Sequence, residues 1–281
     1  MDKMPKKYYA LFTLPTLIAF GISFFIPFLL GIYLSFTKFT TVTNSHWIGV
    51  SNYIRAFSED KTFLNALIFT VKFALVSVVL INVFAFALAY LLSSKIRGTN
   101  IFRTVFFMPN LIGGIVLGYI WQLLINGVLI NFGVDITYSA NFGFWGLVIL
   151  MNWQMVGYMM IIYIAGIKGI SSELIEAAEI DGANSWQILK SITIPLVMPS
   201  FTICTFLTIT NSFKLFDQNL SLTAGAPGRA SSMLALDIFN TFYGRNGYEG
   251  VGQAKAVIFF VIVAVIVLLQ LRFSRSKELE N

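Results

Sequence analysis

Long apolar segments separated by polar segments dominate this sequence and limit what it can fold into. A helix that crosses a membrane needs about 20 mostly apolar residues, because it rises about 1.5 Å per residue through about 30 Å of hydrocarbon. The segments that meet this requirement are Tyr9–Phe36, Ile68–Leu92, Val105–Ile125, Phe144–Ile167, Leu196–Leu215 and Ala254–Phe273. They predict an all-α membrane protein, with six transmembrane helices in one domain over residues 1–281.

The composition favours a membrane protein over a soluble one. Charged residues make up 11% of the 281 residues, whereas a soluble domain contains about 25%. The net charge of +6 does not indicate a nucleic acid partner, because the basic residues lie between the apolar segments rather than on one face. We therefore expect lipid around the chain and no nucleic acid.

The positions of the basic residues predict an orientation. Loops on the cytoplasmic side of a membrane carry an excess of Lys and Arg. With six spans, one side receives Lys3, Lys6, Lys7, Lys95, Arg97, Arg103, Lys168, Lys190, Arg272, Arg275 and Lys277, and the other receives only Lys38, Arg55, Lys61, Arg229 and Arg245. Lys72, Lys214 and Lys255 lie at or inside the span ends and are assigned to neither side. The richer side holds both termini and the segment 168–195, which are therefore predicted to be cytoplasmic.

Side chains for catalysis or metal binding are scarce. His46 is the only histidine and lies in a polar loop, and Cys204 is the only cysteine and lies in an apolar segment. A catalytic triad or a metal site is therefore not expected. The sequence also contains no Gly-Lys pair, so the phosphate-binding loop of ATPases is absent. We expect no enzymatic activity and no cofactor of its own.

The segment between the fourth and fifth apolar stretches predicts two short helices joined by a tight turn. Ser171 and Glu173 favour a helix start, and Asp181–Gly182 favours its end, because glycine permits a left-handed turn. Asn184 or Ser185 is expected to cap a second helix over 186–191, and Pro195 to mark the entry to the fifth span.

This segment resembles the "EAA" loop of permease subunits of ATP-binding-cassette (ABC) importers. The spacing of Glu176-Ala177-Ala178, Gly182, Ile192 and Pro195 is that of the family, although Ile194 stands where the family usually has Leu. The resemblance implies the type I ABC importer permease fold, with loop 168–195 docked on a separate ATPase. It implies that Glu176, Ala177, Ala178, Asp181 and Gly182 couple the chain to that ATPase.

Further motifs resemble the maltose and glycerol-3-phosphate type of binding-protein-dependent permease. They are Phe216–Asp217 with Thr223–Pro227, Met108–Pro109, Trp121, Gly127 with Asn131, and Asn152–Trp153 with Gly157–Met160; Ala226 stands where the family usually has a second Gly. The resemblance implies a second permease subunit in a heterodimer, two cytoplasmic ATPase subunits that bind ATP, an extracellular solute-binding protein and a saccharide substrate. It also implies that the chain lies in a bacterial cell membrane.

Two mixed polar and apolar stripes predict a substrate path. Met151, Gln154, Met155 and Tyr158 share one helix face, and Thr208, Asn211, Ser212 and Leu215 repeat the same spacing on the next span. Amide and hydroxyl groups suit sugar hydroxyls, and an aromatic ring suits the apolar face of a sugar. These positions also correspond to substrate contacts in the maltose-type permeases.

Alternatives remain open for these stripes and for the chain. Polar residues in spans also join helices to each other, and Lys214 indicates either an anionic solute such as a glycerophosphate or a side chain that reaches the membrane surface. A secondary transporter or channel acting alone would need ionisable groups deep in its spans, and an intramembrane enzyme would need a catalytic pair there.

Overall fold

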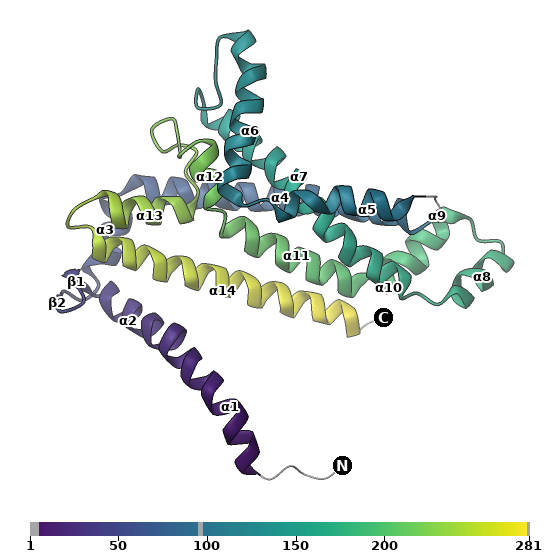
Figure 1. The fold of residues 1–281 in the computed structure, drawn as a ribbon, viewed down its shortest axis with the longest axis horizontal. Helices are drawn as coiled ribbons and strands as arrows, with labels where there is room; N and C mark the ends of the chain where they lie inside the picture. Colours follow the sequence, from purple (N-terminus) through teal and green to yellow (C-terminus); the bar gives the residue numbers. More distant parts are fainter. Residues whose placement is uncertain (1–5, 95–97, 280–281) are drawn as a thin grey trace. The chain divides into compact units, whose positions relative to one another are not determined.

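The computed structural model describes residues 6–94 and 98–279, which are mostly helical (Figure 1). The regular elements are α1 (Lys6–Phe20), α2 (Ile26–Ser35), β1 (Thr37–Thr41), β2 (Asn44–Trp47), α3 (Ser51–Ser58), α4 (Lys61–Ser93), α5 (Thr99–Phe107), α6 (Gly114–Leu129), α7 (Ala140–Lys168), α8 (Ser172–Ile180), α9 (Ser185–Ile188), α10 (Ile194–Leu196), α11 (Met198–Phe213), α12 (Asp217–Leu222), α13 (Leu234–Gly244) and α14 (Glu249–Leu279). Short π-helical segments cover Gly21–Phe25 and Leu189–Thr193, and 3₁₀ segments cover Met108–Leu111 and Ile130–Phe132. Lys3, Lys95 and Arg97, which contributed to the predicted orientation, lie outside the described residues.

Helices long and apolar enough to cross a membrane agree with the predicted class of fold. Within residues 6–94 and 98–279 they are Leu11–Ser35, Lys61–Ser93, Gly114–Phe132, Ala140–Lys168 and Glu249–Arg272. The pair Ser185–Leu196 and Met198–Phe213, bent by 65°, adds a sixth if it is counted as one span. The prediction of a helical membrane protein is thus confirmed, and the structure contains five spans, or the predicted six when the bent pair counts as the fifth. The predicted sidedness of the termini stays a prediction.

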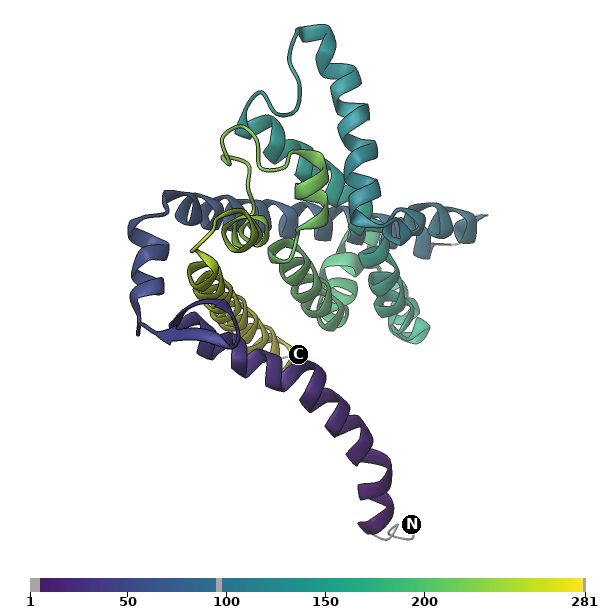
Figure 2. The same cartoon turned by 60° about the vertical axis from the view of Figure 1, so that its left-hand side comes forward.

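The third predicted span, Val105–Ile125, is not one continuous helix. Helix α5 ends at Phe107, a 3₁₀ turn containing Pro109 follows, and Ile112 and Gly113 are extended before α6 begins. Proline cannot donate the backbone hydrogen bond that an α-helix needs, which explains a break here. Consequently α6 runs across the direction of α4 (Figure 1, Figure 2), and the apolar segment that could cross a membrane is Gly114–Phe132.

Contacts divide the chain into two compact units, Met1–Phe63 with Ile238–Phe260 and Leu64–Asp237 with Val261–Asn281. The predicted single domain over 1–281 stays a prediction. In the second unit α7 is the central helix, with Leu150, Met159 and Tyr163 fully buried. The Tyr163 hydroxyl donates to Asn82 Oδ1 of α4 at 2.6 Å, so the polar group of this buried ring is satisfied.

In the first unit, α2 is followed by the antiparallel hairpin β1–β2, which pairs Thr37 with Trp47. The apolar pattern gave no indication of this hairpin. Asn52 of α3 ties it to the helices, because its Nδ2 donates to the carbonyl oxygens of Ser35 at 2.9 Å and Thr37 at 2.8 Å. A single buried amide therefore fixes the start of β1 against α3.

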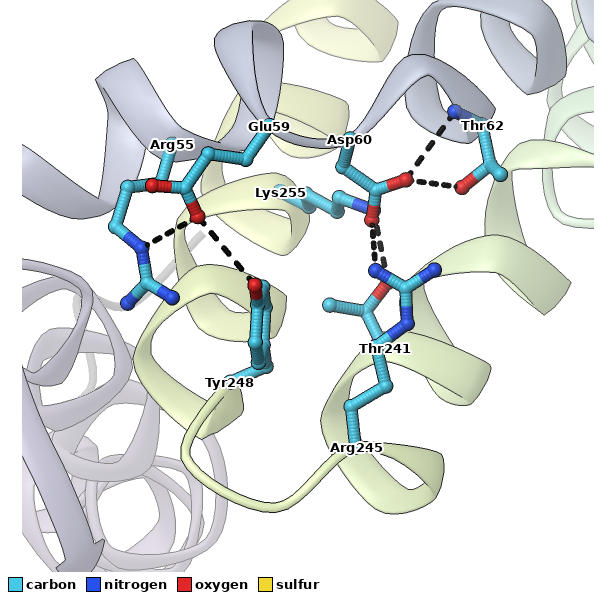
Figure 3. Close-up of polar contacts among 8 residues, drawn as sticks. All are labelled: Arg55, Glu59, Asp60, Thr62, Thr241, Arg245, Tyr248 and Lys255. Atoms are coloured by element: carbon cyan, nitrogen blue, oxygen red, sulfur yellow. Dashed lines mark hydrogen bonds and ion pairs between the residues drawn. The ribbon is translucent and has the colours of Figure 1, made fainter.

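A buried ion cluster joins the start of α4 to α13 and α14 (Figure 3). The Asp60 carboxylate is 2% exposed and accepts from Lys255 Nζ at 2.9 Å and Arg245 Nη1 at 2.8 Å. Lys255 is 0% exposed and also donates to Thr241 Oγ1 at 2.8 Å. Thr62 donates to Asp60 through its backbone N–H and its hydroxyl. These contacts compensate the cost of removing both charges from water.

Two glycines let α6 approach α12 closely. A Cβ atom at Gly114 would lie 2.7 Å from Asp217 Cβ, and one at Gly118 would lie 1.9 Å from Ser221 Oγ. Real Cβ atoms do not come this near to other heavy atoms, so larger residues would push the helices apart. The Gly-x-x-x-Gly spacing of the sequence therefore marks a close helix contact within the chain, as such spacing does in other membrane helices.

Gly118→Leu is expected to lower the free energy of unfolding by about 1–3 kcal/mol through overpacking against α12. Gly127→Leu is the matched control on the same helix, because nothing lies within 4 Å of a Cβ atom there. Denaturant unfolding in mixed micelles measures both. Equal stability of the two variants would show that α6 does not pack on α12 as described.

Candidate functional sites in an exposed loop and a polar cavity

The segment predicted to be the coupling loop folds as two capped helices. Ser171 caps α8, because its hydroxyl accepts from the backbone N–H of Glu173 at 3.2 Å. Asn184 and Gln187 cap α9 reciprocally, each side chain accepting from the other residue's backbone N–H, at 3.0 and 2.8 Å. Such capping satisfies donors that a helix start leaves open, so local chemistry alone specifies both helix starts.

Gly182 forms the turn between the two helices. Its φ is +82°, its backbone N–H donates to Glu179 O at 3.1 Å, and the N–H of Ala183 donates to Ala178 O at 2.9 Å. This pair of bonds is a Schellman motif, whose left-handed residue is usually glycine. A Cβ atom at Gly182 would meet nothing within 4 Å. The position therefore requires glycine for its backbone angle and not for close approach within the chain.

The second helix of the loop differs from the predicted 186–191. From Ser185 it continues through the π-helical segment Leu189–Thr193 into α10. The wider π turn accommodates Pro195, which offers no N–H to an α-helical bond. The first turn of α11 instead contains Pro199, so the prediction that Pro195 begins the fifth span was wrong.

The loop exposes large apolar side chains that the chain itself does not cover. Leu174 is 51% exposed, Ile180 86% and Trp186 69%, and α8 has no buried residue. Of the predicted coupling residues, Glu176, Ala177, Asp181 and Gly182 are exposed and Ala178 is partly buried. An apolar surface with an acidic edge, placed on a stiff helical turn, is typical of a docking element for another protein.

A polar cavity of about 300 Å³ lies where α7, α11 and α12 meet, within the second unit. Residues from both predicted stripes line it, namely Met151, Gln154, Met155, Asn211 and Leu215. Gln154 Oε1 accepts from Gln218 Nε2 at 2.9 Å, and Gln154 Nε2 donates to the carbonyl of Ile112 at 3.4 Å. These amides connect α12, α7 and the break before α6, so they form a fixed wall.

Three residues of the predicted stripes do not line this cavity. Thr208 and Ser212 are 0% exposed, and the Thr208 hydroxyl donates to the carbonyl of Cys204 at 2.7 Å within its own helix. Tyr158 is partly buried and its ring lies 6.3 Å from that of Phe107. The helical spacing therefore identified the side of each span only approximately, because side chains at the edge of each stripe are buried in helix packing and do not reach the cavity.

Other residues that line the cavity were not among the predicted substrate contacts. They are Asn110, Lys214, Phe216, Asp217 and Gln218. Asn110, Lys214 and Phe216 lie between the α-helices, and Asp217 and Gln218 begin the short helix α12. No periodic pattern therefore points to a shared face. The Phe216–Asp217 pair carried a signal, because the sequence resembles the permeases there. Lys214 was singled out either for an anionic solute or as a side chain that reaches the membrane surface.

Asn219 holds the loop that follows α12. Its Nδ2 donates to Ser231 O at 2.9 Å and Thr223 Oγ1 at 3.1 Å, and its Oδ1 accepts from the backbone N–H of Met233 at 2.8 Å. Asn219 is 0% exposed. These hydrogen bonds therefore hold the loop Thr223–Gly228 in a defined conformation next to the cavity-lining helix α12.

Known transport proteins resemble this chain in sequence. The chain is 46% identical to the probable starch degradation products transport system permease protein AmyD of Thermoanaerobacterium thermosulfurigenes, over 97% of this chain and 96% of that one. It is 30% identical to the multiple sugar-binding transport system permease protein MsmF of Streptococcus mutans, over 98% of both chains.

The fold is that of a solved importer subunit. A chain in the crystal structure of a bacterial alginate ABC transporter, in complex with an alginate pentasaccharide-bound periplasmic protein, matches with a TM-score of 0.82 at 21% identity, over 97% of this chain and 96% of that chain. This likeness confirms the predicted ABC importer permease fold. Residues 85–278 match the model of one protein family. The chain therefore belongs to the family of binding-protein-dependent transport system inner membrane components, and it is a multi-pass membrane permease.

Proposed function

We propose that the chain is one of two different permease subunits of an ABC importer and forms part of the path for a saccharide. An extracellular solute-binding protein delivers the saccharide, and two separate cytoplasmic ATPase subunits bind and hydrolyse ATP. Both termini and loop 168–195 face the cytoplasm. The residues that couple the chain to the ATPase are Glu176, Ala177, Ala178, Asp181 and Gly182.

The polar cavity supports a saccharide as the solute. Its lining combines amides of Asn110, Gln154 and Asn211 with the ring of Phe216, and amides with an aromatic face suit the hydroxyls and the apolar face of a sugar. The relatives are named for starch degradation products, for multiple sugars and for trehalose and maltose. We therefore assign a neutral glucose oligosaccharide as the class to test first.

The exposed loop is the observation that carries the proposed coupling. Leu174, Ile180 and Trp186 present apolar surface that the described side chains, those of residues 11–94 and 98–272, do not bury. An ATPase subunit with an apolar groove and basic rim would bury these side chains and meet Glu173, Glu176 and Glu179. Trp186 is the largest of the three and serves as the anchor of this contact, as aromatic side chains often do.

The test uses the complete importer in proteoliposomes with labelled maltotriose. Uptake is expected to require both the solute-binding protein and ATP. Trp186→Ala should lower the amount of ATPase that co-purifies with the permeases about thirtyfold, corresponding to about 2 kcal/mol for an anchoring aromatic side chain, and uptake should fall with it.

Trp47→Ala is the control, because Trp47 is similarly exposed, at 62%, but lies in the β1–β2 hairpin. It should leave the ATPase bound. Uptake that continues without ATP would favour a transporter acting alone, and normal ATPase binding by Trp186→Ala would remove the anchor from the proposal.

A further inference from the structure

Two opposite charges line the polar cavity, and the substrate stripes do not account for either. Lys214 follows the last residue of α11 and Asp217 is the first residue of α12. Both side chains are exposed and both line the cavity. The remaining lining residues carry no charge: Asn110, Met151, Gln154, Met155, Asn211, Leu215, Phe216 and Gln218.

Neither charge is taken up by a partner elsewhere in the described chain. Among the side chains that the structure describes, those of residues 11–94 and 98–272, the ion pairs join Arg55 to Glu59, and Arg245 and Lys255 to Asp60. Lys214 and Asp217 take part in none of them. Both groups are therefore free to act on a solute, whereas Gln154 and Gln218 already bond to each other at 2.9 Å.

The pair makes the cavity electrically balanced. Lys214 alone would attract an anion and Asp217 alone would attract a cation, and charges act over longer distances where protein and lipid replace water. Because both line the same cavity, they largely cancel for a solute that fills it. A carboxylate accepts hydrogen bonds from hydroxyl groups and an ammonium group donates them, so the same pair can bind an uncharged polyol.

We propose that Asp217 and Lys214 together set the charge selectivity of the path, with Asp217 excluding acidic saccharides that Lys214 alone would admit. This assignment rests on the proposed function of the chain as a saccharide permease. Fold alone does not decide the charge of the solute, because the alginate importer whose structure the chain matches carries an acidic polysaccharide. The distinction lies in which charges line the cavity.

The test measures the electrostatic potential in the cavity. The solute-binding protein is left out, because its own selectivity would obscure that of the cavity. Cys204 is the only cysteine of the chain and is 0% exposed, so Asn211→Cys adds an accessible thiol to the cavity lining. In the assembled importer, with its other subunits made cysteine-free, this thiol is reacted with 2-sulfonatoethyl and 2-(trimethylammonio)ethyl methanethiosulfonate. The uncharged methyl reagent corrects for accessibility.

Adding Asp217→Asn should raise the ratio of the anionic to the cationic reaction rate about tenfold, and Lys214→Gln should lower it about tenfold, because each leaves one charge uncompensated. Asp217→Glu should restore the original ratio, and Asp135→Asn, at a carboxylate outside the cavity lining, should not change it. An unchanged ratio in Asp217→Asn would overturn the proposal.

Uptake separates this failure from a failure of the proposed function. ATP-driven maltotriose uptake by the unmodified importer, together with an unchanged ratio in Asp217→Asn, would leave the function standing and remove Asp217 from selectivity. If the unmodified importer showed no such uptake, the result would instead contradict the proposed function as a saccharide permease. A changed ratio in Asp217→Asn, together with ATP-driven maltotriose uptake by the unmodified importer, supports both.

Discussion

Replacing Lys255 by Met is expected to lower the free energy of unfolding by about 3 kcal/mol, because it breaks a buried ion pair by removing one partner. Lys255 is 0% exposed and its Nζ lies 2.9 Å from Asp60 Oδ2. Without it, the nearly buried carboxylate of Asp60 keeps only Arg245 as a cationic partner in this cluster, and the Arg245 side chain is 30% exposed. Denaturant unfolding in mixed micelles, followed by tryptophan fluorescence, measures the change.

A matched lysine separates the ion pair from a general effect of removing charge. Lys61 is adjacent to Asp60 in sequence but exposed, so Lys61→Met should change stability by no more than about 0.5 kcal/mol. The double variant Asp60→Asn with Lys255→Met should be less destabilised than the sum of its single variants, because neither charge is then left without the other. A Lys255→Met protein as stable as Lys61→Met would show that the cluster contributes little.

The stabilisation that this ion cluster provides also depends on pH. Burial by itself would raise the pKa of Asp60, but hydrogen bonds from Thr62 and Lys255 and the charges of Lys255 and Arg245 outweigh it and lower the pKa below its ordinary 3.8. A carboxyl whose pKa is lowered in the folded state stabilises the fold above its ordinary pKa, and this stabilisation is lost as the pH falls through the lowered value. The Lys255→Met penalty should therefore persist from neutral pH to about pH 4 and narrow below it.

The parts of the fold that the sequence predicted well are those determined by local chemistry. The cap at Ser171, the left-handed turn at Gly182 and the cap at Asn184 each depend on neighbours within a few residues. The apolar spans likewise follow from length and composition. The break between α5 and α6 was missed because the apolar character continues through Pro109 and Gly113, so hydrophobicity alone predicted one helix there.

The cavity shows where sequence reasoning stops. Helical spacing placed Gln154 and Asn211 on faces that do line it. It also included Thr208 and Ser212, which packing buries completely, since spacing defines a face but not what covers it. The sequence marked Asp217 only as part of a motif that resembles the permeases. It did not predict that Asp217 lines the cavity, because that depends on how α12 packs against α6.

Replacing Gly182 by Pro is expected to abolish ATP-driven uptake while the permease still assembles in the membrane. Proline fixes φ near −65°, whereas Gly182 has a φ of +82°, and proline would also remove the N–H that donates to Glu179 O. The Schellman turn between α8 and α9 would then be lost. A docked loop can transmit ATPase movement only while its two helices keep a fixed angle, so hydrolysis should continue without transport. Parallel measurement of ATP hydrolysis and maltotriose uptake in proteoliposomes checks this.

Further substitutions at Gly182 test whether the left-handed backbone angle is the reason that glycine is required. Since nothing lies within 4 Å of a Cβ atom at Gly182, the size of a new side chain costs little inside the chain and the backbone angle decides. Asn tolerates the left-handed conformation and should retain most uptake, whereas Val, strained there by about 1–3 kcal/mol, should lose most of it. If Asn failed as completely as Pro, the requirement would instead come from close contact with the ATPase surface. If Pro retained full uptake, a stiff turn would not be needed for coupling at all.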